Sequence, residues 1–124
     1  MYLWDKIQED HFEKPSLLYY KGKKADESWT DVQSIDLNNW FGDYDGWWDA
    51  SRGAKGYAEQ SKGEMVIPEP PGDPDDPHDE LKLIANMKKK NKEYRGPQGI
   101  FLYEFFDMDN DGHLQRNQYF PTHP

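Results

Sequence analysis

Residues 100–118 read IFLYEFFDMDNDGHLQRNQ, a run of apolar residues followed directly by an acidic run. The first seven residues are apolar almost all round, a pattern typical of a buried helix. In the acidic run, Asp107, Asp109 and Asp111 occupy alternate positions and Gly112 comes next. Alternate carboxylates can converge on one point there, because glycine permits a sharp reversal of the chain. The stretch therefore predicts a helix followed by a cation-binding loop.

This pattern resembles the EF-hand calcium-binding family over about residues 99–120. The resemblance implies a Ca²⁺ site whose ligands are Asp107, Asp109, Asp111, the backbone carbonyl of His113 and Gln118. Gln118 stands where the family usually has a bidentate glutamate, and an amide offers one neutral oxygen. We therefore expect weak binding, with Mg²⁺ as an alternative ion. An acidic turn that binds no ion is the other interpretation of these residues, since Asp, Asn and Gly are common turn formers.

EF-hands usually occur in pairs, and residues 69–94 are the place where a degenerate partner hand would lie. In this region Leu81, Ile84 and Met87 recur at helical spacing, and basic residues gather towards position 95. The preceding prolines make an ordinary ion loop unfavourable. The alternative is a pair of plain helices joined by a loop.

The fold class predicted from these patterns is mainly α, with long irregular segments. Helical spacing predicts further helices over residues 2–13 and 30–42, and residues 16–33 are compatible with a short β-hairpin. The predicted organisation is an aromatic-rich N-terminal region (1–63), a Pro- and Asp-rich linker (64–78) and an EF-hand-like helical region (79–124). No internal repeat is evident from the sequence.

The composition excludes several classes of function. The formal charge of −9 would repel phosphate backbones, so nucleic-acid binding is not expected. There is no cysteine to form disulfides or thiolate sites. No apolar run approaches the ~20 residues of a membrane span, and no signal peptide is evident. We expect an intracellular protein of unassigned organelle, with a mitochondrial complex as one option.

Aromatic residues supply most of the candidate binding surface. The chain has five Trp and eight Tyr, and Trp40, Trp47 and Trp48 are the candidate partner-binding residues. Catalytic motifs are absent and no small-molecule substrate is evident, so we predict that the protein is not an enzyme. The main hypothesis is an accessory or structural subunit of a larger protein assembly, bound to other subunits, whose C-terminus is ordered by the calcium loop. The alternatives are a free-standing weak calcium sensor or buffer, and a Trp-based sugar or peptide binding domain.

Overall fold

The computed structural model describes residues 3–13, 16–50, 53–70, 75 and 79–116. Within these ranges the protein is built from strands and four short 3-10 turns, with no α-helix. The strands are β1 (Ile7–Glu13), β2 (Leu17–Gly22), β3 (Gln33–Asp36), β4 (Gly42–Tyr44), β5 (Trp47–Asp49), β6 (Ser61–Glu69), β7 (Glu80–Met87), β8 (Gln98–Phe101), β9 (Phe106–Met108) and β10 (Leu114–Arg116). The turns are η1 (Leu3–Lys6), η2 (Leu37–Asn39), η3 (Tyr57–Gln60) and η4 (Leu102–Glu104).

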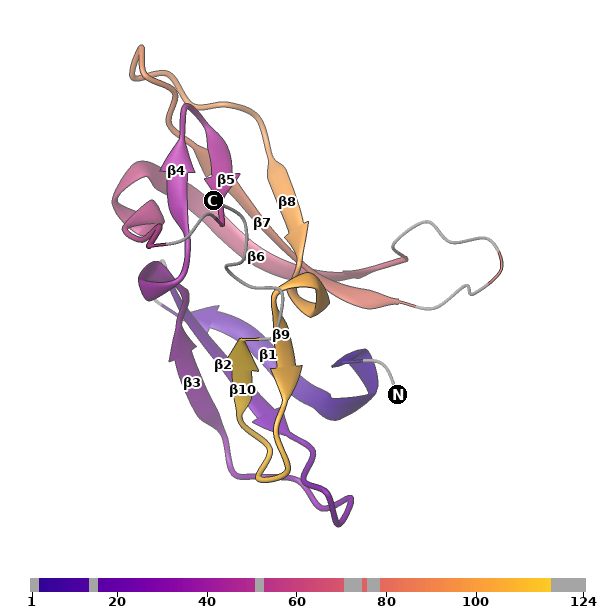
Figure 1. The fold of residues 1–124 in the computed structure, drawn as a ribbon. Helices are drawn as coiled ribbons and strands as arrows, with labels where there is room; N and C mark the ends of the chain where they lie inside the picture. Colours follow the sequence, from indigo (N-terminus) through magenta and orange to yellow (C-terminus); the bar gives the residue numbers. More distant parts are fainter. Residues whose placement is uncertain (1–2, 14–15, 51–52, 71–74, 76–78, 117–124) are drawn as a thin grey trace.

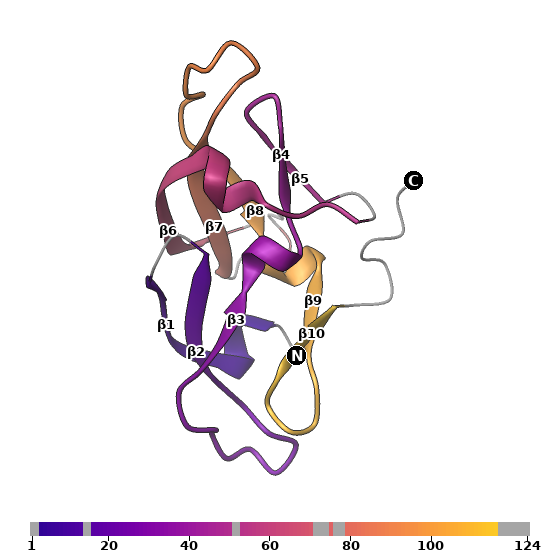
Figure 2. The same cartoon turned by 90° about the vertical axis from the view of Figure 1, so that its left-hand side faces the viewer.

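The strands form two lobes, and each lobe combines a three-stranded sheet with a hairpin from the other half of the chain (Figure 1). The first lobe holds the antiparallel sheet β1-β2-β3 and the hairpin β9-β10. The second lobe holds the sheet β6-β7-β8 and the hairpin β4-β5. The chain therefore crosses between the lobes at η2 and again at η4, and both views show these turns near the middle of the molecule (Figure 2).

The two lobes repeat one structural pattern with a shift of 65 positions. The isolated bridge between Lys23 and Trp29 returns between Lys88 and Tyr94, that is, 23 to 88 and 29 to 94. A non-glycine residue with positive φ follows the same shift, because Glu27 has φ 70° and Lys92 has φ 74°. From β2 onward, the sequence carries the repeat in seven identical pairs: Leu18/Leu83, Lys23/Lys88, Lys24/Lys89, Gln33/Gln98, Ile35/Ile100, Leu37/Leu102 and Phe41/Phe106. An internal repeat is thus present, contrary to the expectation from the sequence.

The core lies where the two lobes meet and uses the repeated apolar residues. Leu18, Leu37, Phe41 and their counterparts Leu83, Leu102 and Phe106 are all 0% exposed. The Phe41 ring meets the rings of Trp48, Phe105 and Phe106 edge-on, with centroids 5.5, 5.4 and 6.3 Å away. Phe41, Phe105 and Phe106 closely follow the crossing turns η2 and η4, so burying their rings also ties the lobes together.

The predicted mainly α fold class is wrong. The clearest case is β7, where Leu81, Leu83, Ala85 and Met87 are buried at every second position. Leu81 and Met87 also fit the 3.6-residue period of a helix together with Ile84. The same residues are therefore compatible with a helix and with the two-residue period of a strand. The predicted helix at 30–42 is instead strand β3 followed by η2, and the one at 2–13 is η1 followed by β1.

The run from 100 to 106 was taken for a helix because apolar residues cover nearly all its positions. It is in fact the end of β8, the turn η4 and the first residue of β9, and it is apolar because it crosses the centre of the molecule. Strand pairing does occur in the region of the expected hairpin at 16–33, where β2 pairs antiparallel with β3. The three-part division at 1–63, 64–78 and 79–124 stays a prediction, and much of its middle part lies outside the described residues. Of the described residues, none belong to a helix long and apolar enough to cross a membrane.

Candidate functional site

The predicted calcium ligands lie in and around the turn of the β9-β10 hairpin. The Asp109 carboxylate accepts the backbone N–H groups of Asp111 and His113, each at 2.9 Å, and so stabilises the turn itself. The carbonyl of His113 accepts the N–H of Asp109 at 2.9 Å. Asp107 and Asp111 are exposed, and Gln118 lies outside the described residues.

The prediction of a calcium cofactor is wrong, as are the EF-hand resemblance and its partner hand at 69–94. The described part of the chain holds no group of three or more His, Asp or Glu side chains that could bind a metal ion. An EF-hand also needs flanking helices, and here strands flank the loop. The Asp-x-Asp-x-Asp-Gly pattern instead serves a hairpin turn, in which an Asp side chain satisfies backbone N–H groups and Gly112 adopts φ +81°.

The three candidate partner-binding tryptophans lie in different environments. Trp40 packs edge-on against Phe106 with centroids 5.4 Å apart, and Trp48 donates its indole N–H to the Gln98 carbonyl at 2.8 Å. Trp47 is 48% exposed, and the Arg95 guanidinium lies 4.0 Å from its ring centroid. Of these three, Trp47 is the one with a large open surface.

A polar hollow of about 350 Å³, pocket A, lies in the first lobe where the loop after β2 meets the β9-β10 hairpin. The loop is fixed by its backbone. Lys24 and Ser28 form a backbone hydrogen bond of 2.8 Å, and the Ala25 N–H reaches the Asn110 carbonyl across the pocket at 2.9 Å. The lining residues are Lys6, Lys23, Lys24, Ala25, Asp26, Glu27, Met108, Asp109 and Asn110.

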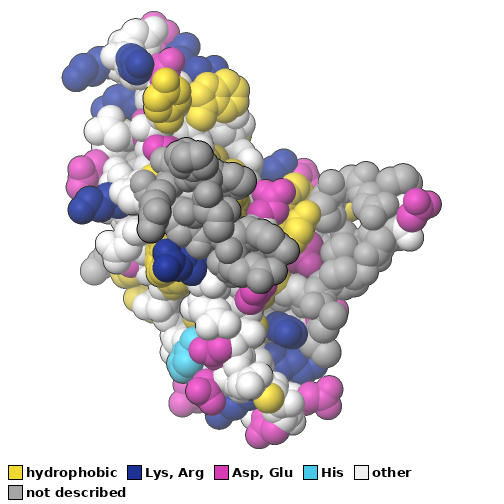
Figure 3. All heavy atoms as spheres, viewed as in Figure 1, with side chains coloured by type: hydrophobic (Ala, Val, Ile, Leu, Met, Phe, Trp, Pro, Cys, Tyr) yellow, Lys and Arg dark blue, Asp and Glu magenta, His cyan; other side chains and the backbone are white. Residues whose placement is uncertain are grey.

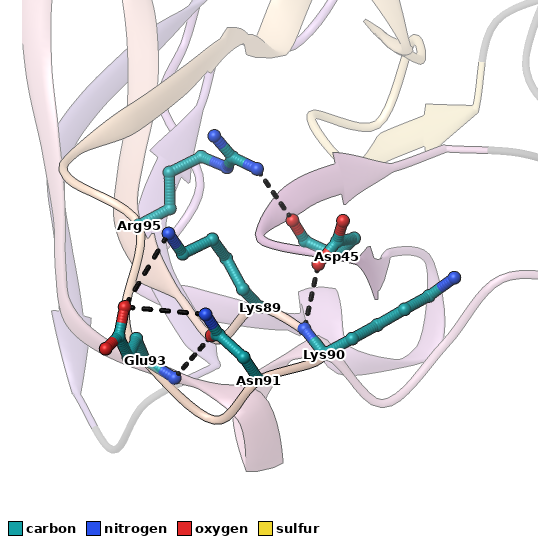
Figure 4. Close-up of polar contacts among 6 residues, drawn as sticks. All are labelled: Asp45, Lys89, Lys90, Asn91, Glu93 and Arg95. Atoms are coloured by element: carbon teal, nitrogen blue, oxygen red, sulfur yellow. Dashed lines mark hydrogen bonds and ion pairs between the residues drawn. The ribbon is translucent and has the colours of Figure 1, made fainter.

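A second hollow of about 270 Å³, pocket B, occupies the equivalent place in the second lobe, between the loop after β7 and the β4-β5 hairpin. Here the Asp45 carboxylate accepts the Lys90 N–H at 2.8 Å, and the Asp45 carbonyl accepts Arg95 Nη2 at 3.0 Å (Figure 4). The lining residues are Asp43, Tyr44, Asp45, Gln60, Lys88, Lys89, Lys90 and Lys92.

The two pockets correspond almost residue by residue under the same shift of 65 positions. The hairpin contributes Met108, Asp109 and Asn110 to pocket A, and Asp43, Tyr44 and Asp45 to pocket B. Each loop begins with a lysine whose N–H binds a 3-10 turn carbonyl, Lys23 to Lys6 at 2.8 Å and Lys88 to Gln60 at 2.7 Å. A recurring hollow between a loop and a hairpin is thus a property of the fold.

Carboxylates in the pockets are held in contrasting ways. In pocket A, the hydroxyl and N–H of Ser28 both donate to Asp26, and these bonds lower the pKa of that exposed carboxyl. In pocket B, partial burial raises the pKa of Asp43, whose Oδ1 accepts the Gly46 N–H at 2.8 Å. Both carboxylates therefore accept hydrogen bonds from turn residues and line the hollows.

The lining chemistry of pocket A suits hydrogen bonding to a polar ligand without net charge. Ammonium, carboxylate, amide and backbone groups alternate around pocket A, with the Ala25 and Met108 side chains beside them. Such a set provides donors and acceptors at close spacing. Neither hollow has the enclosed apolar walls typical of drug-like or cofactor sites. The arrangement can therefore bind a small hydroxyl-rich molecule or the end of a larger one.

Comparison with solved structures shows which fold this is. The chain matches an NMR structure of GzCVNH, the CVNH (cyanovirin-N homology) protein of Gibberella zeae, with a TM-score of 0.71 and 16% identity over 92% of this chain and 95% of that one. It also matches a crystal structure of a MoCVNH3 variant in complex with (N-GlcNAc)4, with a TM-score of 0.67 and 11% identity over 90% and 94% of the two chains. The chain has the CVNH fold. No protein-family model and no curated protein matches it.

The prediction that the chain is not an enzyme agrees with these neighbours. The interpretation as an accessory subunit with a calcium loop is less well supported than the sugar-binding alternative, because one of the neighbours was crystallised with a saccharide. The prediction that no small-molecule substrate is evident stands against the same neighbour, which was crystallised with a saccharide.

Sequence reasoning missed most of both pockets. It placed Asp109 in an ion site and Lys88 to Lys92 on a helix end, and it singled out none of residues 23–27. The signal that could have found them is the repeat: Lys23-Lys24 and Lys88-Lys89 each stand ten residues before a glutamine, Gln33 and Gln98. Two loops that start alike and end alike predict two equivalent structures.

Proposed function

We propose that this protein is a non-enzymatic carbohydrate-binding domain with one saccharide site in each lobe. The observation that carries the proposal is the pair of hollows at equivalent positions, pocket A and pocket B, in a fold shared with a protein crystallised with (N-GlcNAc)4. The finer assignment of sugar binding to the tryptophans extends at most to Trp47, because Trp40 and Trp48 are partly buried against the core.

Pocket A presents its binding groups on a loop whose backbone is already fixed before the ligand arrives. The loop from Lys23 to Glu27 is held by backbone hydrogen bonds at Lys24, Ala25 and Glu27, all between 2.8 and 2.9 Å. The loop backbone then loses little conformational entropy when a ligand binds, which favours affinity for small ligands. The Lys24 ammonium and the Glu27 carboxylate are exposed at the pocket and offer a donor and acceptors to sugar hydroxyls.

A glycan array probed with the labelled chain, followed by calorimetry with (N-GlcNAc)4 and with the strongest neutral ligand from the array, tests this proposal. We expect binding of two saccharides per chain. Lys24→Ala in pocket A and Lys89→Ala in pocket B are matched variants, because the two lysines are equivalent under the repeat. Each should weaken one site roughly 5–10-fold, the loss of about 1 kcal/mol or slightly more that follows from removing one hydrogen bond to a charged group.

Lys55→Ala is the control, since Lys55 is exposed and lines neither pocket. It should bind like the wild type. An array without any bound glycan would overturn the proposal. A Lys24→Ala, Lys89→Ala double variant that binds as tightly as the wild type would show that the sugar site lies elsewhere.

A further inference from the structure

We infer that pocket B binds a negatively charged saccharide, one that bears a carboxylate or a sulfate, whereas pocket A binds a neutral one. The inference rests on the proposed function and adds a ligand class to one of its two sites. It comes from comparing the charges that two otherwise equivalent hollows present to a ligand.

The lining of the pockets differs in charge. Three lysines and three acidic residues line pocket A, which makes its formal charge zero. Four lysines and two aspartates line pocket B, which makes its formal charge +2. This excess of positive charge sits on a chain whose net charge is −9. A local reversal of sign against the overall charge selects for an anionic ligand at that place.

The carboxylates of both aspartates in pocket B already accept hydrogen bonds from backbone N–H groups. Asp45 Oδ1 accepts the Lys90 N–H and Asp43 Oδ1 accepts the Gly46 N–H, each at 2.8 Å. In the described part of the chain, no carboxylate lies within 4 Å of the ammonium groups of Lys88, Lys90 or Lys92. Lys89 has one ion pair, a long one of 3.9 Å to the exposed Glu93 (Figure 4). The positive charge of the pocket is therefore open to a ligand.

Aromatic rings hold two of these lysines in place. The Lys90 ammonium lies 5.4 Å from the centroid of the Tyr44 ring, and the Lys88 ammonium lies 5.6 Å from that of Tyr94. Lys62 adds a third cation 4.2 Å from the Tyr94 centroid. Such contacts attract a cation to a ring face and limit the freedom of its side chain. The charges are thus positioned rather than spread through solvent.

The neighbouring aromatic surface favours a sugar over a simple anion. Tyr44 lines pocket B, is 64% exposed, and pairs across the hairpin with Trp47, which is 48% exposed. Figure 3 shows hydrophobic side chains beside Lys and Arg side chains over the end of the molecule that carries β4 and β5. An aromatic face packs against the C–H face of a sugar ring, and an inorganic ion has no apolar face to offer it. At the equivalent position, pocket A has Asp109 instead of Tyr44.

Calorimetry with two matched ligand pairs tests the inference. The pairs are trigalacturonate with its methyl ester, and a 6-sulfated GlcNAc trimer with the unsulfated trimer. At low ionic strength at least one acidic ligand should bind about tenfold or more tighter than its neutral form, and salt should weaken that binding. A Lys88→Gln, Lys90→Gln double variant should lose the preference, with a roughly tenfold drop in affinity for the acidic ligand. Lys55→Gln, which removes a positive charge outside both pockets, should change the affinity less than twofold.

The outcomes separate this inference from the proposed function. If neutral sugars bind and neither acidic member binds more tightly, or if the double variant keeps the acidic preference, the charge assignment to pocket B is wrong while the sugar-binding domain stands. If tripolyphosphate binds pocket B as tightly as the acidic trisaccharides, the site is a plain anion site and the inference is also wrong. If no saccharide binds at all, the proposed function itself fails. A thermal melt of each variant tests whether the chain is still folded.

Discussion

The two lobes have the same backbone frame but fix their pocket loops in different ways. In the first lobe the loop binds the opposite hairpin through backbone atoms, from the Ala25 N–H to the Asn110 carbonyl. In the second lobe a side chain fixes the loop to the hairpin, because the Lys90 N–H donates to the Asp45 carboxylate at 2.8 Å. Two different kinds of contact therefore hold the same backbone frame, and the side chains that line each pocket without fixing its loop can differ between the lobes.

The lobes also differ in how closely the sheet and the hairpin approach each other. In the first lobe, a Cβ added to Gly22 would lie 1.9 Å from the Gly112 carbonyl oxygen. The position equivalent to Gly22 in the second lobe holds Met87, a fully buried side chain. The same backbone pattern therefore accommodates a backbone contact at Gly22 in one lobe and a buried side chain, that of Met87, in the other.

Substitution of the shared core should have the largest effect and should affect both lobes equally. Phe41→Ala and Phe106→Ala each remove a fully buried ring from the crossing segments. We expect each to lower the free energy of unfolding by about 3–5 kcal/mol, measured by chemical denaturation. Val32→Ala, at a position 49% exposed, is the control and should change it by less than ~1 kcal/mol. A large effect at Phe41 alone would contradict the equivalence of the lobes.

One added methyl group at Gly22 should disrupt the close contact between the backbones of Gly22 and Gly112 in the first lobe. Gly22→Ala places a Cβ against the backbone of Gly112, which has little room to move. We expect a loss of stability of about 3 kcal/mol, at the upper end of the range for overpacked sites. Gly96→Ala is the matched control, because no heavy atom lies within 4 Å of its added Cβ. Equal melting temperatures for the two variants would show that the contact is absent in solution.

Buried tyrosines predict a loss of stability in alkaline solution. Burial raises the pKa of Tyr20, in the first lobe, and of Tyr57, in the second. Each hydroxyl keeps its proton to a higher pH in the folded chain than in the unfolded chain, which ionises near pH 10, so their contribution to stability is complete below pH 10 and decreases above it. Between its unfolded and its folded pKa, each tyrosine should lower the free energy of unfolding with a slope of at most about 1.4 kcal/mol per pH unit.

Denaturation curves between pH 8 and 11 measure this slope. Tyr57→Phe should make it shallower, whereas Tyr44→Phe, at an exposed position, should leave it unchanged. Tyr20→Phe should also cost about 1–3 kcal/mol at neutral pH, because the phenol oxygen accepts the buried Leu114 N–H at 2.9 Å. A pH-independent stability up to pH 11 would contradict the burial of these two rings.

The smallest expected effect concerns the different ways of fixing the loops. Asp45→Ala removes the acceptor of the Lys90 N–H and should lower the protection of that amide in hydrogen exchange by roughly fivefold, equivalent to about 1 kcal/mol. Asn110→Ala keeps the backbone acceptor, so the protection of the Ala25 amide should stay the same. If both variants loosened their loops equally, the distinction between side-chain and backbone fixation would be wrong.

The sequence contained more of this fold than its periodicity revealed. The alternation of Leu81, Leu83, Ala85 and Met87 gives a strand, but Ile84 between them is also apolar, and the helical interpretation used it. The repeat is present in the sequence in pairs such as Leu37 and Leu102. However, seven identical pairs scattered along two segments 65 positions apart are a weak signal without a structural alignment.

The pockets depend on information that local patterns do not carry. Pocket A joins residues 23–27 to 108–110, and only the exchange of hairpins between the lobes brings these segments together. The acidic loop at 107–112 was correctly placed as a sharp turn, but three alternate aspartates fit both a calcium loop and an Asx-type hairpin turn.

The most direct measurement of the central claim is a ¹⁵N–¹H NMR titration of the wild-type chain with the strongest saccharide from the array. We expect shifts confined to amides of residues 23–27 and 108–110, of residues 43–45 and 88–92, or of both groups. Shifts clustered elsewhere, such as on β6 (Ser61–Glu69), or a spectrum unchanged at saturating saccharide, would contradict it.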